Sequence, residues 1–370
     1  MRIVNAEVFI DGQFVRGGID FDERINEAGA SVEGNADITL NGEYIIPGLV
    51  DIHTHAAVNE DASDGKAEAM PILGRYYAKE GVTSFLPTTM TLSEADLTKA
   101  VKAIASYKRP NDGAKIAGIN LEGPFLSKAK KGAQNEAFLH DPDFDMLMRL
   151  NEASGNMVRL VTVAPEENGA IEFIEKASKY VTVSIGHTAC DYDTAMAAYK
   201  AGASHATHLY NGMPGLLHRA PGVIAAALDS NASVELISDG FHIHPSVVRL
   251  TSKLFGDKLC LISDSLRCAG MPDGEYELGG QPITVEDGKA YIKGTNTIAG
   301  SSIHLMDGLR RAVSFGVPLE KAILAATLSP AKAVKLDNEI GSLEKGKSGD
   351  FVILDKDLNV KAVYIDGKRI

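Results

Sequence analysis

The sequence predicts an α/β fold, a TIM-like (β/α)₈ barrel with a small β-sandwich domain built from both termini. Two observations predict the barrel: between residues 49 and 335, short apolar runs alternate with stretches of helical period, which is typical of βαβ units. These runs also number roughly eight or more, which favours a closed barrel over an open parallel sheet. The third observation concerns the two ends of the chain, where short strand-like runs alternate with hairpin turns instead.

The two ends are expected to pair with each other. Asp11-Gly12, Asn41-Gly42 and Asp366-Gly367 are hairpin-turn signals. Neither end holds enough strands for a stable sheet of its own, so a shared sheet is expected. We expect residues 1–48 together with 336–370 to form the small β domain, and residues 49–335 to form the catalytic barrel.

The predicted barrel strands are bounded by polar or glycine-rich turns, and helix-period stretches such as DYDTAMAAYKAGA follow several of them. In chain order the candidates are GLVDIHTH, VTSFLPT, KIAGINLEG, VRLVTVAPE, VTVSIGHT, SHATHLYN, VELISDG, KLCLISDS and TIAGSS, the last being a candidate for closing the barrel.

Composition and charge limit the function classes. The formal net charge of −12 over 370 residues opposes nonspecific binding to nucleic acid or to an acidic membrane. The three cysteines form no CxxC pair, which favours a reducing compartment. The N-terminus lacks the pattern of a signal peptide, and no run approaches the ~18 apolar residues needed to span a bilayer. We therefore expect a cytoplasmic protein.

Imidazole and carboxylate side chains close several of the predicted strands. The active site of a barrel forms where its strands end, so closure would bring these side chains together. A single His or Asp at a strand end is more often structural, but six such endings on separate strands are not explained in that way. His and carboxylate ligands suit Zn²⁺ or a similar divalent metal. The residues are His53 and His55, Glu122, His187, His208, Asp239 and Asp264.

Other polar residues near the strand ends are given separate roles. Asp264 is expected to act as the proton-transferring carboxylate beside the metal. Asp239 fits a helix cap better than a catalytic role. The glycine-rich stretch THLYNGMPGLLHRAPG carries Asn211 and Arg219, and such loops can bind a phosphate. Arg219 and His242 are the candidates for anchoring an anion.

The motifs IIPGLVDIHTH, NLEGPFL, SIGHT, THLYNGMP, SDGFH, LISDS and AGSS, in this order over essentially the whole chain, resemble the N-acetylglucosamine-6-phosphate deacetylase family of the amidohydrolase superfamily. The resemblance implies hydrolysis of the acetamide of N-acetylglucosamine 6-phosphate to glucosamine 6-phosphate and acetate. It also implies a homodimer in which the second subunit helps to complete the phosphate site.

The resemblance implies roles for individual residues. Glu122, His187 and His208 would hold a divalent metal, with Zn²⁺ expected first and Fe²⁺, Mn²⁺ or Co²⁺ as alternatives, and Asp264 would be catalytic. Because His53 and His55 are both present, one or two ions per subunit are expected, and Glu122 would bridge two. The implied substrate contacts are Ala133, Asn211, Gly212, Arg219, His242, Ile298, Ala299 and Gly300.

Two departures from the family pattern affect the predicted site. Gln134 stands where some relatives have a histidine that polarises the acetyl carbonyl, and its amide N–H can donate the same hydrogen bond without a charge. The residues after His55 lack the expected glycine-rich start.

Three other functions stay open at this point. An N-acetylgalactosamine-6-phosphate deacetylase would use the same motifs, and a deaminase, dihydroorotase-like or dipeptidase-like amidohydrolase would use the same barrel. A non-catalytic scaffold is disfavoured, because every expected ligand and Asp264 are present.

Overall fold

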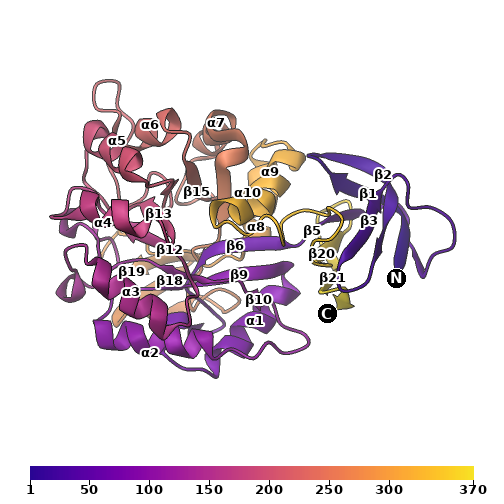
Figure 1. Cartoon of the computed structure of the whole chain (residues 1–370), viewed down its shortest axis with the longest axis horizontal. Helices are drawn as coiled ribbons and strands as arrows, with labels where there is room; N and C mark the ends of the chain where they lie inside the picture. The colour runs from indigo at the N-terminus through magenta and orange to yellow at the C-terminus, as the bar shows by residue number, and fades with distance from the viewer.

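The computed structural model describes residues 1–370 of the chain. A large α/β body and a small β domain lie side by side, and both chain termini belong to the small domain (Figure 1). This arrangement confirms the predicted fold class. The domain boundaries at residues 48 and 336 stay a prediction.

Parallel strands form the barrel, each hydrogen-bonded to the next. They are β6 (Leu49–Thr54), β9 (Val82–Thr89), β11 (Ile119–Leu121), β12 (Val158–Val163), β13 (Thr182–Ile185), β14 (His205–Ala206), β15 (Ser233–Ile237) and β16 (Leu259–Ile262). The short β10 (Lys115–Ile116) precedes β11 and pairs with an earlier part of β9. The ring closes just beyond β16, where the Asp264 backbone N donates to His53 O at 2.9 Å and His55 N donates to Ser265 O at 3.1 Å.

Helices cover the outside of the barrel, as helical periodicity between the strands predicts (Figure 1). They are α1 (Ala69–Lys79), α2 (Glu94–Ala105), α3 (Phe144–Ala153), α4 (Ala170–Ala177), α5 (Tyr192–Ala201), α6 (Gly222–Asp229), α7 (Pro245–Phe255), α8 (Leu305–Ser314) and α9 (Leu319–Ala326). A further helix, α10 (Leu328–Ala333), packs on the interior of the barrel. Side chains of Ser93, Asp143 and Asp191 accept from backbone N–H groups at the starts of α2, α3 and α5, which satisfies donors that a helix leaves unpaired.

Two hydrophobic clusters hold the barrel together. The larger lies between the strands and the helices. The smaller fills the inside of the barrel, where Val50, Leu160 and Ile262 pack with Ala331 of α10 and with Val334. Since α10 and the smaller cluster close one end of the barrel, the interior is open to ligands only at the end where the strands finish.

The small domain is one curled sheet in the order β22-β21-β20-β5-β1-β2-β3, with β4 paired to β1. Its strands are β1 (Arg2–Ile10), β2 (Gln13–Phe21), β3 (Ile25–Gly29), β4 (Ile38–Thr39), β5 (Tyr44–Pro47), β20 (Phe351–Leu354), β21 (Val360–Ile365) and β22 (Lys368–Arg369). The C-terminal β20 runs antiparallel to the N-terminal β5, so the predicted pairing of the two ends is confirmed. Phe21 packs against Phe351 and Tyr364 because the sheet folds over its own core.

One sequence expectation is wrong. TIAGSS does not form a barrel strand: only an isolated bridge joins Ser301 to Ser265. The barrel is already complete at β16, so TIAGSS instead passes beside its open end. It follows a three-stranded antiparallel insertion, β17 (Gly274–Leu278), β18 (Gln281–Glu286) and β19 (Lys289–Ile292). Gln281 Nε2 ties this insertion to Ala133 by a 2.5 Å hydrogen bond to the backbone oxygen.

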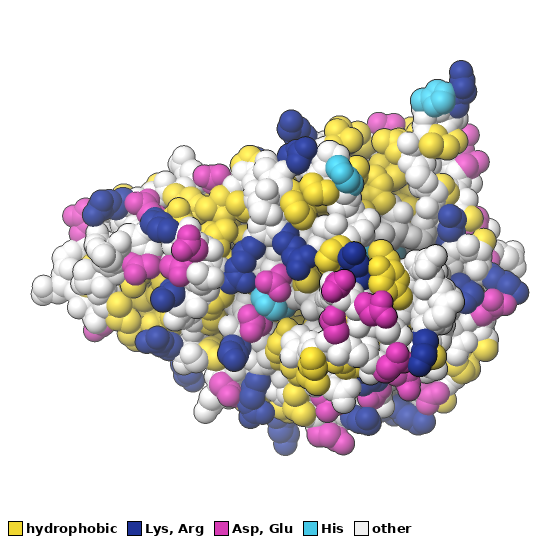
Figure 2. Space-filling view, turned by 180° about the vertical axis from the view of Figure 1, so that it is seen from behind, with side chains coloured by type: hydrophobic (Ala, Val, Ile, Leu, Met, Phe, Trp, Pro, Cys, Tyr) yellow, Lys and Arg dark blue, Asp and Glu magenta, His cyan; other side chains and the backbone are white.

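Short elements complete the chain. They are the paired β7 (Ala56–Ala57) and β8 (Glu60–Asp61), and the 3₁₀ turns η1 (Ala62–Asp64), η2 (Lys128–Lys130), η3 (Glu136–Phe138) and η4 (Gly256–Lys258). None of the helices combines the length and the apolar character needed to cross a membrane. On the face shown in Figure 2, basic and acidic side chains are interspersed.

Candidate active site

Three of the site residues, which follow the ends of barrel strands, have an unusual backbone conformation. His187, His208 and Asp264 have φ angles of 46°, 26° and 47°, in the left-handed region that residues other than glycine seldom adopt. Such conformations cost free energy and cluster at functional sites, where surrounding structure enforces them. Here they turn three side chains inward as the chain leaves β13, β14 and β16.

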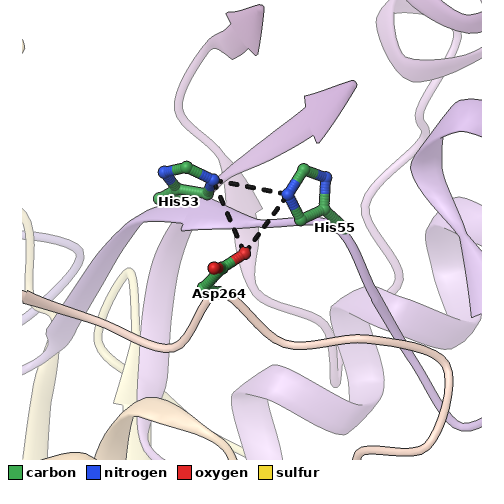
Figure 3. Close-up of side chains that lie close together, drawn as sticks. All are labelled: His53, His55 and Asp264. Carbon is green, nitrogen blue, oxygen red and sulfur yellow. Dashed lines mark hydrogen bonds and ion pairs between the residues drawn. The ribbon is translucent and has the colours of Figure 1, made fainter. Parts of the chain in front are cut away.

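The first group of potential metal ligands consists of His53, His55 and Asp264 (Figure 3). The two Nε2 atoms lie 3.3 Å apart. Asp264 Oδ1 lies 3.3 Å from Nε2 of His55 and 3.6 Å from Nε2 of His53. Two ligands at about 2.0–2.1 Å from a tetrahedral Zn²⁺ stand about 3.3 Å apart, so this spacing fits a metal.

The second group consists of Glu122, His187 and His208. Glu122 Oε1 lies 3.1 Å from Nε2 of His187 and 2.9 Å from Nε2 of His208, and these two nitrogens are 3.0 Å apart. All three side chains are buried. Three ligand atoms of this kind, in contact and shielded from water, make a donor set that a divalent cation suits.

Glu122 also joins the two groups. Its Oε1 is 3.4 Å from His53 Nε2, and its Oε2 is 3.3 Å from His55 Nε2. One carboxylate therefore faces the ligand atoms of both groups. This position supports the expectation that Glu122 would bridge two ions.

Hydrogen bonds on the far side of the rings set which nitrogen faces the site. Nδ1 of His55 donates to Thr88 O at 3.1 Å, and Nδ1 of His187 donates to Lys130 O at 2.8 Å. A proton held on Nδ1 leaves the Nε2 lone pair free for a metal, so these acceptors fix the ligating tautomer.

The electrostatics of the site couple histidines to carboxylates. Burial opposes charge on His53, but Glu235, Glu122 and Asp264 outweigh it and raise its pKa to about 9. Burial likewise opposes ionisation of Glu122 and Asp264, yet the neighbouring histidines lower the pKa of each carboxyl below its ordinary value. Both carboxyl groups are thus ionised at neutral pH, which favours a bound cation.

A cavity of about 360 Å³ opens above these ligands. The structure brings 13 of the 15 predicted site residues to its wall: His55, Glu122, Ala133, Gln134, His187, His208, Asn211, Gly212, His242, Asp264, Ile298, Ala299 and Gly300. His53 is buried beneath it. A larger cavity of about 550 Å³ adjoins the small β domain, but no group of metal ligands lies there.

Arg219 is not brought to this cavity. It lies in an exposed loop, and its Nη1 contacts Nε2 of His218 at 2.8 Å. His242, in contrast, lines the cavity and is held by Asp239, whose Oδ2 is 2.7 Å from His242 Nδ1. Oδ1 of Asp239 accepts from the backbone N–H groups of Phe241 and His242, so Asp239 supports this turn.

Gln134 makes a contact that the sequence did not reveal. Its Nε2 donates to Glu122 Oε2 at 2.6 Å, and its Oε1 accepts from the backbone N of Thr91 at 2.7 Å. In this conformation its amide orients Glu122. Its role in polarising the acetyl carbonyl stays a prediction.

Sequence reasoning missed two buried residues beneath the site, Glu235 and His205. Glu235 stands in the middle of β15, and its Oε2 is 2.9 Å from His53 Nδ1. Burial opposes its ionisation, but His53 and His205 outweigh burial and lower its pKa. A charged residue inside the otherwise apolar run VELI was the signal that could have revealed it.

The fold and the ligand groups define a metal-dependent hydrolase of the barrel type. The family model described as the amidohydrolase family matches residues 44–370, and the chain belongs to this family.

Among its relatives, the N-acetylglucosamine-6-phosphate deacetylase of Vibrio furnissii is 34% identical, with 90% of this chain and 84% of the relative covered. The N-acetylgalactosamine-6-phosphate deacetylase of Escherichia coli O157:H7 is 35% identical, with 89% and 88% covered. The crystal structure of N-acetyl-D-glucosamine-6-phosphate deacetylase from Mycobacterium smegmatis is 32% identical, covers 100% of both chains and has a TM-score of 0.94. These comparisons confirm the resemblance stated from the sequence motifs.

Proposed function

We propose that the chain hydrolyses the acetamide of N-acetylglucosamine 6-phosphate, releasing acetate and glucosamine 6-phosphate. The observation that carries this proposal is the pair of buried ligand groups that share Glu122 at the base of the cavity. Deacetylase relatives similar over most of their length support the substrate.

Glu122, His187 and His208 would hold one divalent cation, and His53, His55 and Asp264 would hold a second. Zn²⁺ is the proposed metal, with Fe²⁺, Mn²⁺ and Co²⁺ as alternatives for the same donors. A cation bound there supplies Lewis-acid polarisation of the acetyl carbonyl and lowers the pKa of water.

Asp264 is the proposed proton carrier. It lines the cavity, and its lowered pKa means that it is ionised, so its carboxylate has no proton of its own and can receive one from water. The water oxygen becomes bonded to the acetyl carbon, and the C–N bond then breaks. Asp264 delivers the proton to the departing amine nitrogen, so that the amide and water yield acetate and a free amine.

His242, Asn211 and Gly212 are proposed to bind the sugar phosphate at the rim of the cavity. Phosphate binding away from the reacting bond positions the acetamide over the ligand groups.

We further propose a homodimer in which Arg219 of a second copy completes this phosphate site. Two observations support the proposal: Arg219 lies outside the cavity of its own chain, and its loop exposes Leu216 and Leu217, the latter to 61%. Exposed apolar side chains at a loop tip favour contact with another protein surface.

The three cysteines are free and buried, which supports the proposed location in the reducing cytoplasm.

Acetate release tests the function. The purified protein is assayed for metal content and for acetate release from N-acetylglucosamine 6-phosphate, from its galacto epimer and from unphosphorylated N-acetylglucosamine. The first substrate is expected to react fastest, and the unphosphorylated sugar to react poorly because it lacks the phosphate anchor. No acetate from any of the three would overturn the proposal.

A further inference from the structure

Beneath the cation site lies a buried carboxylate with no role in the steps above. Glu235 is completely buried in the middle of β15 and does not line the cavity. An ionised carboxylate inside a barrel is costly unless it is paired and hydrogen-bonded, and a Val or Leu would satisfy this strand equally well. Its presence therefore needs a reason within the site.

Three donors converge on this carboxylate. Oε2 accepts from Nδ1 of His53 at 2.9 Å and from the backbone N of His208 at 3.0 Å. Oε1 accepts from Nε2 of His205 at 3.1 Å, and His205 is itself fully buried. The two oxygens are thus held in place from three sides, so Glu235 cannot turn away from His53.

This arrangement makes His53 different from the other histidines of the site. Nδ1 of His55 and of His187 face backbone carbonyl oxygens, and Nδ1 of His208 has no hydrogen-bond partner. Among the four histidines of the two ligand groups, only His53 has a carboxylate hydrogen-bonded to its Nδ1. A carboxylate in this position holds the imidazole in one tautomer and one orientation. It also makes Nε2 a stronger metal ligand than it would be if Nδ1 were bonded to a carbonyl oxygen.

We propose that Glu235 is the positioning residue that makes the His53–His55–Asp264 group a tight cation site, so that the chain holds two ions rather than one. The inference rests on the proposed function, because it concerns the cation site of that reaction. Glu235 touches neither substrate nor cation; it acts through His53. The Glu122–His187–His208 group does not depend on it through any side chain, so the two sites separate when Glu235 is changed.

The test measures cation binding rather than activity alone. Wild type, Glu235→Gln and Glu235→Asp are stripped of metal and titrated with Zn²⁺ and with Co²⁺, with elemental analysis for stoichiometry and the Co²⁺ absorption spectrum for each site. Gln keeps the size and the hydrogen-bonding oxygen but removes the charge. Asp keeps the charge but shortens the side chain by one methylene and withdraws it from His53.

We expect the wild type to bind two ions per chain. Both variants should keep one tight ion and bind the second about 10–100-fold more weakly, as is typical for loss of a carboxylate behind a metal-binding histidine. Asp51→Asn is the matched control: it changes another fully buried carboxyl group of the barrel, which accepts from the backbone N–H groups of His53 and Ser263 and contacts no histidine ring. It should bind two ions normally.

A double substitution adds a readout that a general structural role would not give. In a His53→Ala background, Glu235→Gln should change the affinity of the remaining ion little further, because the side chain through which Glu235 acts is gone and only its contact with the His208 backbone N is left.

Several results would overturn the inference: both ions bound with wild-type affinity by either variant, a wild type that binds a single ion at saturation, or two variants that both fail to fold. The proposed function is tested separately, because it fails only if the wild-type protein releases no acetate.

Discussion

Replacement of Asp264 by Asn gives a direct test of the proposed chemistry. Asn has the same shape, so its Oδ1 can stay near the imidazole of His55, where the Asp264 oxygen lies 3.3 Å from Nε2. What it loses is the ability to accept a proton from water and to return it to the amine. The buried ligand group should otherwise keep its geometry.

The expected loss follows from the two proton transfers assigned to this carboxylate. General acid–base catalysis contributes about 10²–10⁴-fold, which corresponds to about 3–5 kcal/mol of transition-state stabilisation at about 1.36 kcal/mol per tenfold. The KM should change little, because His242 and Asn211 remain in the cavity wall. The substitution should therefore lower kcat at least 100-fold.

The assay measures acetate release over a range of substrate concentrations, with the metal content of each sample determined in parallel. Saturating metal is needed because Asp264 also belongs to the first ligand group. Asp51→Asn serves as the control, since Asp51 is buried in the same barrel but does not line the cavity. A variant at position 264 that carries its full metal content and turns over near the wild-type rate would refute the assignment.

Three further predictions follow from the site. Chelation should lower the free energy of unfolding, by about 4 kcal/mol for metal held at 1,000 times its Kd, and readdition of Zn²⁺ should restore it in urea melts. Asp239→Asn should cost about 1–3 kcal/mol at pH 7, because the hydrogen bond from His242 outweighs burial and lowers the pKa of Asp239. A carboxyl with a lowered pKa contributes its stability above its ordinary pKa, so this difference should shrink as the pH falls below about 4, and a constant difference would contradict it. Gly300→Ala should lower kcat, because φ is +47° and a Cβ there would lie 2.6 Å from Leu266 and 2.9 Å from the Asp264 carbonyl oxygen; unchanged turnover would count against that tight contact.

The sequence predicted the fold and the gathering of the site residues at one end of the barrel for one physical reason. Parallel strands of a barrel end at the same face, so polar residues such as His55, Glu122 and His187 that close separate strands must meet there. That argument needs only the order of strands and their last residues. It requires no knowledge of side-chain conformation.

The features that it missed depend on packing between distant segments. The composition of TIAGSS is typical of a strand, but the barrel closes without it, through hydrogen bonds donated by the backbone N–H groups of Asp264 and His55. In the sequence, Glu235 only interrupts an apolar run, and its hydrogen bond with His53 Nδ1 is visible only in the folded chain. Likewise, only the folded chain shows that Arg219 lies in an exposed loop away from its own cavity.

The pairing of β20 with β5 has a consequence for the chain during synthesis. β5 is made early, but β20, which covers its edge, emerges from the ribosome some 300 residues later. Until then β5 remains an unprotected sheet edge, of the kind that recruits strands from other chains. A chain that ends before Phe351 would keep all the potential metal ligands of the barrel, but the edge of β5 would stay unpaired. The last twenty residues therefore cover the edge of β5, and they move that edge of the finished sheet outward to the two-residue strand β22.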